Sequence, residues 1–366
     1  MQSILNSTIE KIVPVSAQWR LKARKHLDNL AIPRGSLGEL LELAEQLAAI
    51  RENLKPSVKN KAVVTMAGDH GVVAEGVSAF PQEVTQQMVA NFVAGGAAIN
   101  VLAGVAGARV IVVDMGIGAD LDGSFAEKIL SCKVGYGTRN MARGPAMSRE
   151  QAVKSLETGI EIAGGLVGEG VELFATGDMG IGNTTPSSAI LAAVSGRSAR
   201  EVTGRGTGIS DDALENKIRV IESALSVNEP DSEDPVDVLA KVGGFEIGGI
   251  AGLILGAAGH KTPVIVDGFI STAGALLAKK LAPASLDYMI SGHRSLEYGH
   301  RLMLEELGLK PLLELNLRLG EGTGAVLAMN IVEAAAQVIC KMLTFEDAGV
   351  CRNSGGSGHE SVSVSA

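Results

Sequence analysis

The sequence predicts an α/β protein built around an open parallel sheet, and three observations carry this prediction. Short apolar runs that end in glycine-containing loops recur along the chain, amphipathic segments lie between them, and glycine is abundant while aromatic residues make up only 3%. Strands that alternate with helices pair in parallel, because each helix returns the chain to the same end of the sheet. A ligand site is then expected at the carboxyl ends of the strands, where the glycine loops fall.

The individual elements follow from local apolar spacing. Four apolar runs are the strand candidates, at 61–68, 108–116, 171–177 and 262–268. Helices are expected where apolar residues share one helical face, at 37–48, 149–167, 211–227 and 324–343. The glycine-rich run 247–259 is too short to cross a bilayer and is interpreted as a buried helix. Ser36 and Glu39 have the spacing of a capping box before the first of these helices.

The chain is expected to form one large unit with a smaller one beside it. Residues 1–60 carry helical patterns only, so together with part of the C-terminal helix they are expected to form a small helical domain. Residues 61–343 then form the α/β domain. The segment 351–366 is rich in serine and glycine without periodicity, which is typical of a mobile tail.

Composition excludes several classes of protein. The formal charge of −9, without a run of Lys or Arg, argues against a nucleic-acid partner. Cys132, Cys340 and Cys351 are odd in number and widely spaced, so neither a disulfide framework nor a zinc site is indicated and a reducing, cytoplasmic compartment is favoured. The first fifteen residues lack the pattern of a signal peptide, and no membrane association is expected.

The segment 177–185, GDMGIGNTT, is the strongest candidate for ligand binding. It follows a strand candidate and precedes an apolar helix with Pro186 in its first turn, and exposed amides at such a helix start bind anions. Gly177 and Gly182 have the spacing of a P-loop, but Asn183 stands where the phosphate-binding lysine belongs. A monophosphate therefore fits better than ATP. The alternative is a glycine turn that only allows close packing of strand and helix.

Glu321 is the candidate general base. It lies between glycines in LGEGTGA, before the last apolar helix, and surroundings of low polarity would raise its pKa toward a useful range. The alternative is a helix N-terminal carboxylate stabilised by the macrodipole. This segment by itself favours neither.

Three further segments carry polar groups without a defined role. Asp69 and His70 end the first strand, and we favour a structural role for them over proton transfer or metal binding, because the six histidines lack metal-ligand spacing. The segments 204–208 and 291–295, with Lys217, are candidates for further anion contacts, although a lone lysine on an amphipathic helix is usually only solvated.

Taken together, the motifs resemble those of one enzyme family. AGDHGV, FPQEVTQQMVANF, GTRNMARGPAM, GDMGIGNTTPSSA, GRGTGI, GHRSLEYGH and LRLGEGTGA follow one another as in the nicotinate-nucleotide–dimethylbenzimidazole phosphoribosyltransferases, over roughly Gly35 to Leu343. The resemblance implies transfer of 5-phosphoribose from nicotinate mononucleotide to 5,6-dimethylbenzimidazole, which gives nicotinate and α-ribazole 5′-phosphate for the lower ligand of cobalamin. It also implies a Rossmann-like core, a small helical domain, a homodimer, and neither metal nor cofactor.

The resemblance also assigns site residues. Glu321 matches the catalytic base of the family, and Asp178 matches an acidic residue, often glutamate, with a catalytic or supporting role. The phosphoribosyl contacts carry over to Gly177, Met179, Gly180, Gly182, Asn183 and Thr184, with Lys217, Ser291 and Gly292 added. The acceptor pocket carries over to Phe80, Gln87, Met88 and Leu319.

Two alternatives stay open at this point. The same transferase chemistry can act on another acceptor, such as adenine, a differently substituted benzimidazole or a phenol. A protein of another class, a non-catalytic mononucleotide carrier, would bind a monophosphate on the same loops while Glu321 only caps a helix.

Overall fold

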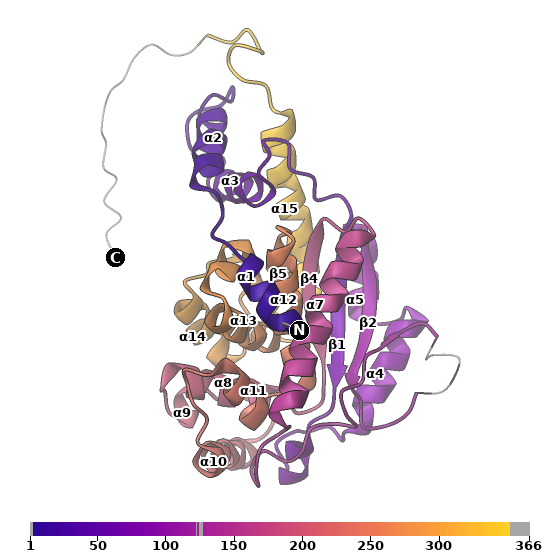
Figure 1. Ribbon diagram of the computed structural model, residues 1–366. Coiled ribbons are helices and arrows are strands. Elements are labelled where there is room, and N and C mark those ends of the chain that lie inside the picture. The colour runs from indigo at the N-terminus through magenta and orange to yellow at the C-terminus, as the bar shows by residue number, and fades with distance from the viewer. Residues whose placement is uncertain (1–2, 122, 124–126, 352–366) are drawn as a thin grey trace.

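A seven-stranded sheet with every neighbouring pair parallel forms the centre of the molecule (Figure 1). The computed structural model describes residues 3–121, 123 and 127–351, so the segment 352–366 of the expected mobile tail lies outside the described residues. The strand order is β3-β2-β1-β4-β5-β6-β7. The bounds are β1 Lys61–Gly68, β2 Ala108–Gly116, β3 Leu130–Ser131, β4 Leu173–Met179, β5 Val264–Val266, β6 Met289–His293 and β7 Pro311–Leu313. The prediction of an α/β fold with a parallel sheet flanked by helices is confirmed.

The long central strands match the sequence pattern best. β1 and β2 occupy the expected residues, and β4 and β5 overlap the other two candidate runs. β3, β6 and β7 were not anticipated, because strands of two to five residues have too little apolar pattern to stand out.

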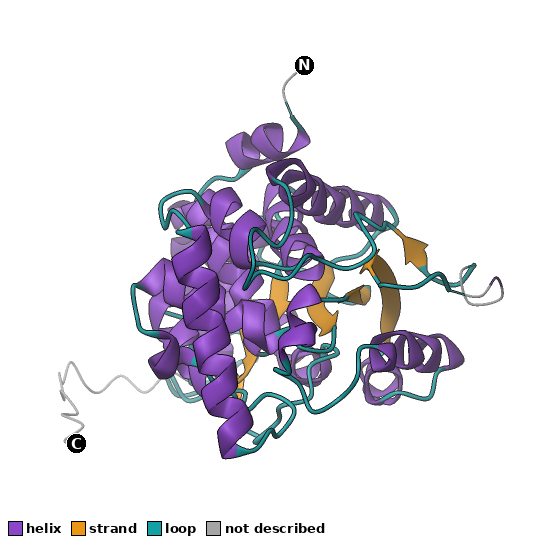
Figure 2. Cartoon of the chain, turned by 90° about the horizontal axis from the view of Figure 1, so that it is seen from below, coloured by secondary structure: helices purple, strands orange, loops and turns teal. Residues whose placement is uncertain are grey.

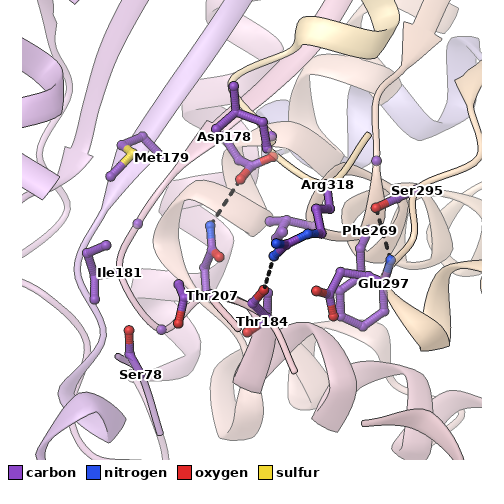
Figure 3. A pocket seen from close by; sticks show the side chains of 18 of the residues that line it. Ser78, Asp178, Met179, Ile181, Thr184, Thr207, Phe269, Ser295, Glu297 and Arg318 are labelled. Atoms are coloured by element: carbon purple, nitrogen blue, oxygen red, sulfur yellow. Dashed lines mark hydrogen bonds between the residues drawn. The ribbon is translucent and has the colours of Figure 1, made fainter. Parts of the chain in front are cut away.

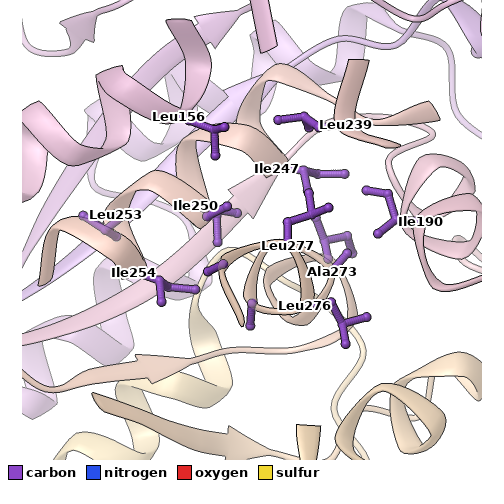
Figure 4. Close-up of a cluster of buried hydrophobic side chains, with 14 of the residues drawn as sticks. Leu156, Ile190, Leu239, Ile247, Ile250, Leu253, Ile254, Ala273, Leu276 and Leu277 are labelled. Atoms are coloured by element: carbon purple, nitrogen blue, oxygen red, sulfur yellow. The ribbon is translucent and has the colours of Figure 1, made fainter. Parts of the chain in front are cut away.

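One face of the sheet is covered by α12 (Phe245–Gly259) and α13 (Phe269–Leu281), with α7 (Arg149–Gly168) packed outside α12. Figure 4 shows Leu156, Ile250 and Leu277 meeting in this core. The backbones of α7 and α12 touch through glycines, since a Cβ on Gly159 would lie 2.0 Å from the carbonyl oxygen of Gly249. The remaining helices of this layer are α1 Ile4–Lys11, α8 Thr184–Ser195, α9 Ala199–Val202, α10 Asp211–Asn228, α11 Pro235–Val242 and α14 Tyr298–Leu307.

The opposite face is covered by α15 (Thr323–Lys341), which crosses β4, β5 and β6, and by α5 (Ala98–Ala106) and α4 (Glu83–Ala94). Helices α2 (Ala17–Leu27) and α3 (Glu39–Arg51) pack together against α15 at one end of the molecule (Figure 1). By length and composition alone, segments 83–106 and 323–341 are apolar enough to span a membrane, but the second is α15, which packs against the sheet.

The N-terminal helices differ from the sequence expectation in two details. The capping box at Ser36 is wrong, because α3 begins at Glu39 and its N-cap is Gly38, which makes no side-chain cap. Helix α1 packs on α7 and α12, away from α2 and α3. The division into a small helical and a large α/β domain stays a prediction.

The strand order reverses at β1. The chain passes from β1 to β2 and β3 on one side and then crosses to β4 on the other side. Connections that leave in opposite directions open a crevice at the carboxyl ends of the two central strands. Figure 2 shows the molecule from below, the direction in which the arrows of β1 and β2 point in Figure 1.

Candidate active site

A cavity of about 260 Å³ opens beyond the carboxyl ends of β4, β5 and β6. Its walls come from residues 178–184 at the end of β4 and after it, residues 268–270 at the start of α13, His293 at the end of β6, and Ser295 and Glu297 after β6. Residues 206–207, 318–320 and parts of 77–80 complete it. In Figure 3, Asp178, Arg318 and Glu297 project toward its centre from different elements.

The loop after β4 forms one wall of the cavity. It turns through Gly182, whose φ of +85° favours glycine, and α8 begins at Thr184 with Asn183 as its N-cap. Among the described residues no side chain caps this helix start, and Asn183 and Thr184 line the cavity where the helix dipole favours negative charge. The backbone N–H of Ile181 donates to Thr85 Oγ1 at 3.1 Å and ties the loop to α4.

Lys217 is a buried cation beside the loop. It reaches in from α10 and donates from Nζ to Thr184 Oγ1 at 2.6 Å, although only 1% of the residue is exposed. Burial lowers the pKa of Lys217 to about 8, and the negative charge of Glu297 acts in the opposite direction. The spacing of the loop alone could not show this, because Lys217 lies more than thirty residues further along the chain.

Asp178 is a buried carboxyl group in the cavity wall. Its Oδ2 accepts from Asn183 Nδ2 at 3.1 Å, whereas its Oδ1 has no partner. Burial, followed by the charges of Asp267 and Glu246, raises the pKa of Asp178 well above its ordinary value. The group therefore holds a proton more readily than an exposed aspartate does.

The backbone of Glu321 is held in an unusual conformation against β4. Its φ is +63°, and its N–H donates to the carbonyl of Asp178 at 3.1 Å. Thr65 Oγ1, on the central strand β1, donates to the Glu321 carbonyl at 2.9 Å. Gly177 leaves room for this turn, since a Cβ there would lie 2.4 Å from the Glu321 oxygen. A left-handed, non-glycine residue fixed from several sides is typical of a functional position.

The carboxylate of Glu321 reaches the start of α5. Its Oε2 accepts from the backbone N–H of Ile99, in the first turn of α5, at 3.2 Å. Burial raises the pKa of Glu321, the Ile99 hydrogen bond lowers it, and the charge of Asp267 raises it further. Glu321 is thus both a buried candidate base and a carboxylate at the start of a helix, but of α5 and not of the helix that follows it.

Two buried acid–histidine pairs lie beside the loop. His293 lines the cavity with its Nε2 3.6 Å from Asp267 Oδ1. His70 Nε2 lies 2.8 Å from Glu246 Oε1; burial alone would lower the pKa of His70, but Glu246 more than offsets this and raises it. Asp69 accepts at Oδ2 from Gly118 N–H at 2.7 Å. In the described part of the chain, no three His, Cys, Asp or Glu side chains are placed to hold a metal ion.

Some of the residues predicted from the sequence line the cavity, and others do not. Those that line the cavity are Phe80, Asp178, Met179, Gly180, Gly182, Asn183, Thr184 and Leu319. Lys217 lies directly behind Thr184, and Glu321 lies behind Gly320. Gly177, Ser291 and Gly292 lie within strands β4 and β6 and not in the lining, while Gln87 and Met88 lie on α4, also outside it. Their roles stay predictions.

Sequence reasoning missed several residues of the site. Arg318 and Glu297 line the cavity, and Asp267 and Glu246 supply buried charge beside Asp178. Arg318 belongs to the motif LRLGEGTGA and Glu297 to GHRSLEYGH. Glu246 is a charged residue at the start of a long apolar helix, a pattern that could have indicated a functional carboxylate. Asp267 lies at the end of the strand candidate 262–268. Its sequence neighbours give no sign that the fold places it close to Asp178.

The chain is similar to known proteins over nearly its whole length. A family model described as Phosphoribosyltransferase matches residues 12–350. A nicotinate-nucleotide–dimethylbenzimidazole phosphoribosyltransferase of Syntrophotalea carbinolica is 58% identical over 349 residues, which is 95% of this chain and 99% of that protein. One of Chloroflexus aggregans is 54% identical over 348 residues, 95% and 98% of the two chains. The crystal structure of CobT from Thermus thermophilus superposes with a TM-score of 0.88 at 48% identity, covering 92% of this chain and all of that one.

Proposed function

The chain belongs to the phosphoribosyltransferase family of that model, and we propose that it transfers 5-phosphoribose from nicotinate mononucleotide to 5,6-dimethylbenzimidazole. The products are nicotinate and α-ribazole 5′-phosphate, a building block of the lower ligand of cobalamin. One observation carries the proposal: a single cavity is lined by the start of α8, whose Thr184 is bonded to the buried Lys217, and by Asp178, whose backbone is bonded to that of Glu321.

The 5′-phosphate binds at the start of α8. The amides of this helix and the ammonium group of Lys217 meet it, and Arg318, whose Nη1 donates to the Gly206 carbonyl at 3.4 Å, supplies a second cation. Anchoring the phosphate fixes the distance from the ribose to the acceptor, which converts a bimolecular attack into an oriented one.

The leaving group needs little help. Nicotinate bound through its ring nitrogen is a pyridinium, so it departs as a neutral pyridine nitrogen when the C1′–N bond breaks and the bonding electrons return to the ring. One benzimidazole nitrogen attacks C1′ from the opposite face and turns the β-linked donor into an α-linked product. The other nitrogen gives its proton to the carboxylate of Glu321, whose burial raises its pKa and so makes it a better proton acceptor than an exposed glutamate.

Asp178 supports the reaction beside Glu321. Its raised pKa favours the protonated form, which donates a hydrogen bond without placing a second full negative charge next to Glu321. Its Oδ1 is buried and has no hydrogen-bond partner among the described residues, so a hydrogen bond to the substrate in this proposal requires a small rearrangement of the cavity wall.

The acceptor ring binds against apolar side chains. Phe80 and Leu319 line the cavity and are 51% and 58% exposed, so a flat apolar ring that covers them removes apolar surface from water. Gln87 and Met88 on α4 complete the acceptor pocket in this proposal.

The proposed enzyme works in the cytoplasm as a homodimer. The three cysteines are free thiols, which suits a reducing compartment. Val101 and Val105 lie one turn apart on α5 and are 62% and 72% exposed, an apolar stripe that a second copy would cover. Sedimentation equilibrium of the purified chain tests the dimer, and a monomer at micromolar concentration would count against it.

The activity test incubates the purified protein with nicotinate mononucleotide and 5,6-dimethylbenzimidazole, and follows nicotinate and α-ribazole 5′-phosphate by mass. Glu321→Gln should keep the fold and donor binding and lose most turnover. The matched control is Glu314→Gln, which removes an exposed carboxylate paired with Arg294 and should retain full turnover. A carrier protein would release no nicotinate, and a panel with adenine, other benzimidazoles and phenols would show a different acceptor preference.

A further inference from the structure

Glu297 is a carboxylate of the cavity wall that the reaction described above does not use. It is the residue before α14, it is 8% exposed, and its Oε2 has no hydrogen-bond partner. In Figure 3 its side chain enters the cavity from the side opposite Ile181, with the oxygens turned toward Thr184. A desolvated acceptor without a partner is costly unless a ligand supplies the missing donor.

The position of Glu297 is fixed by its neighbours. A Cβ on Gly204 would lie 2.5 Å from Glu297 Oε2, so the carboxylate is packed directly against the backbone of the 203–210 loop. Its own N–H donates to Ser295 Oγ at 3.2 Å. Glu297 is also close enough to Lys217 for its charge to act on that ammonium group, which places it beside the proposed phosphate anchor.

The chemistry of a carboxylate at this point excludes most groups of the donor nucleotide. An ionised carboxylate only accepts hydrogen bonds, and it repels the phosphate and the nicotinate carboxylate. The pyridinium ring carries no N–H. The 2′- and 3′-hydroxyls of the ribose are therefore the only dependable hydrogen-bond donors of nicotinate mononucleotide, and the ribose lies between the phosphate and C1′.

We infer that Glu297 accepts hydrogen bonds from the ribose hydroxyls of the donor and makes the site selective for ribonucleotides over deoxyribonucleotides. This inference rests on the proposed function. Asp178 Oδ1 and His293 Nδ1 are the other acceptors in the cavity wall without partners. Asp178 belongs to the end of the cavity beside Glu321, where C1′ reacts, and His293 is packed against Gly268 and Gly324. Of these three groups, Glu297 is the one whose charge acts on Lys217.

The expected discrimination follows from the strength of one hydrogen bond to a charged group. A donor that lacks the bonded hydroxyl leaves the Glu297 carboxylate buried and unpaired, which corresponds to roughly 10- to 100-fold weaker binding.

The experiment measures binding without an acceptor. Calorimetry gives the Kd of nicotinate mononucleotide and of its 2′-deoxy and 3′-deoxy analogues for the wild-type protein and Glu297→Ala. The control is Glu305→Ala, which removes an exposed carboxylate paired with Arg301 on the same helix. The wild-type protein and the control should bind at least one deoxy analogue roughly 10- to 100-fold more weakly than the ribonucleotide. Glu297→Ala should bind all three within about threefold of one another.

Three results separate the possibilities. Full discrimination in a folded Glu297→Ala would overturn the inference, and so would a shift of all three Kd values by the same factor, because that is the signature of an altered charge at Lys217 alone. If Glu297→Ala does not fold, Glu297→Leu, which fills more of the space but carries no acceptor oxygen, replaces it, and undiminished discrimination there has the same meaning. Wild-type protein that binds no nicotinate mononucleotide and shows no turnover would instead overturn the proposed function.

Discussion

Replacement of Gly177 by alanine should impair catalysis through the backbone of Glu321. A Cβ at Gly177 would lie 2.4 Å from the carbonyl oxygen of Glu321 and 2.9 Å from Thr65 Oγ1, whereas ordinary contacts begin at 3.4 Å. The Glu321 turn must therefore retreat by about 1 Å, a displacement that can lower turnover roughly 100-fold when the displaced group is catalytic. Overpacking of this kind also costs about 1–3 kcal/mol of stability.

The assay compares initial rates of nicotinate release by the wild-type protein and Gly177→Ala, with the Kd of nicotinate mononucleotide measured alongside. The Kd should change little, because the phosphate contacts arise from α8 and Lys217. The control is Gly165→Ala in α7, where an added Cβ has nothing within 4 Å, and it should keep full turnover with a small gain in stability. A folded Gly177→Ala with turnover within about threefold of wild type would refute the coupling between β4 and Glu321.

Three further predictions test other groups of the site. Thr65→Val keeps the side-chain shape but removes the donor to the Glu321 carbonyl. In steady-state assays kcat should fall about tenfold, and in urea denaturation the free energy of unfolding should fall by roughly 1–3 kcal/mol. Thr65→Ser, which keeps the hydroxyl, should recover most of both. The pKa of Lys217 is lowered to about 8, so the ammonium group is present below that pH and lost above it, and a pH series should show donor affinity falling toward about tenfold per unit above pH 8; affinity that is flat from pH 7 to 9.5 would remove Lys217 from the phosphate anchor. Because the pKa of Asp178 is raised well above its ordinary value, Asp178→Asn should keep kcat within about tenfold while Asp178→Ala loses much more, and equal losses in the two variants would show that the ionised form is the one required.

The local pattern of the chain was sufficient for the central sheet and for the glycine loop. Strand β1 is buried along its whole length and β2 over its last five residues, and such long apolar runs can be recognised without knowledge of the neighbouring strands. The loop at Gly177 could be recognised from the sequence because its glycines, Asn183 at the position of the P-loop lysine, and the start of the following helix lie within ten residues of one another. The short strands β6 and β7 were missed because their pairing with neighbours, and not their own composition, makes them strands.

The sequence by itself was enough to predict two parts of the site. These are a phosphate-binding loop without its own lysine at 177–185, and a glutamate between glycines, Glu321. Only the tertiary structure decided that Lys217 contacts Thr184 and that the carboxylate of Glu321 faces the start of α5. It also decided that Glu297 lines the cavity close to Lys217. The physical reason is that helices and strands depend on neighbours a few residues apart, whereas burial, pKa shifts and unpaired acceptors depend on contacts between segments that only the folded topology brings together.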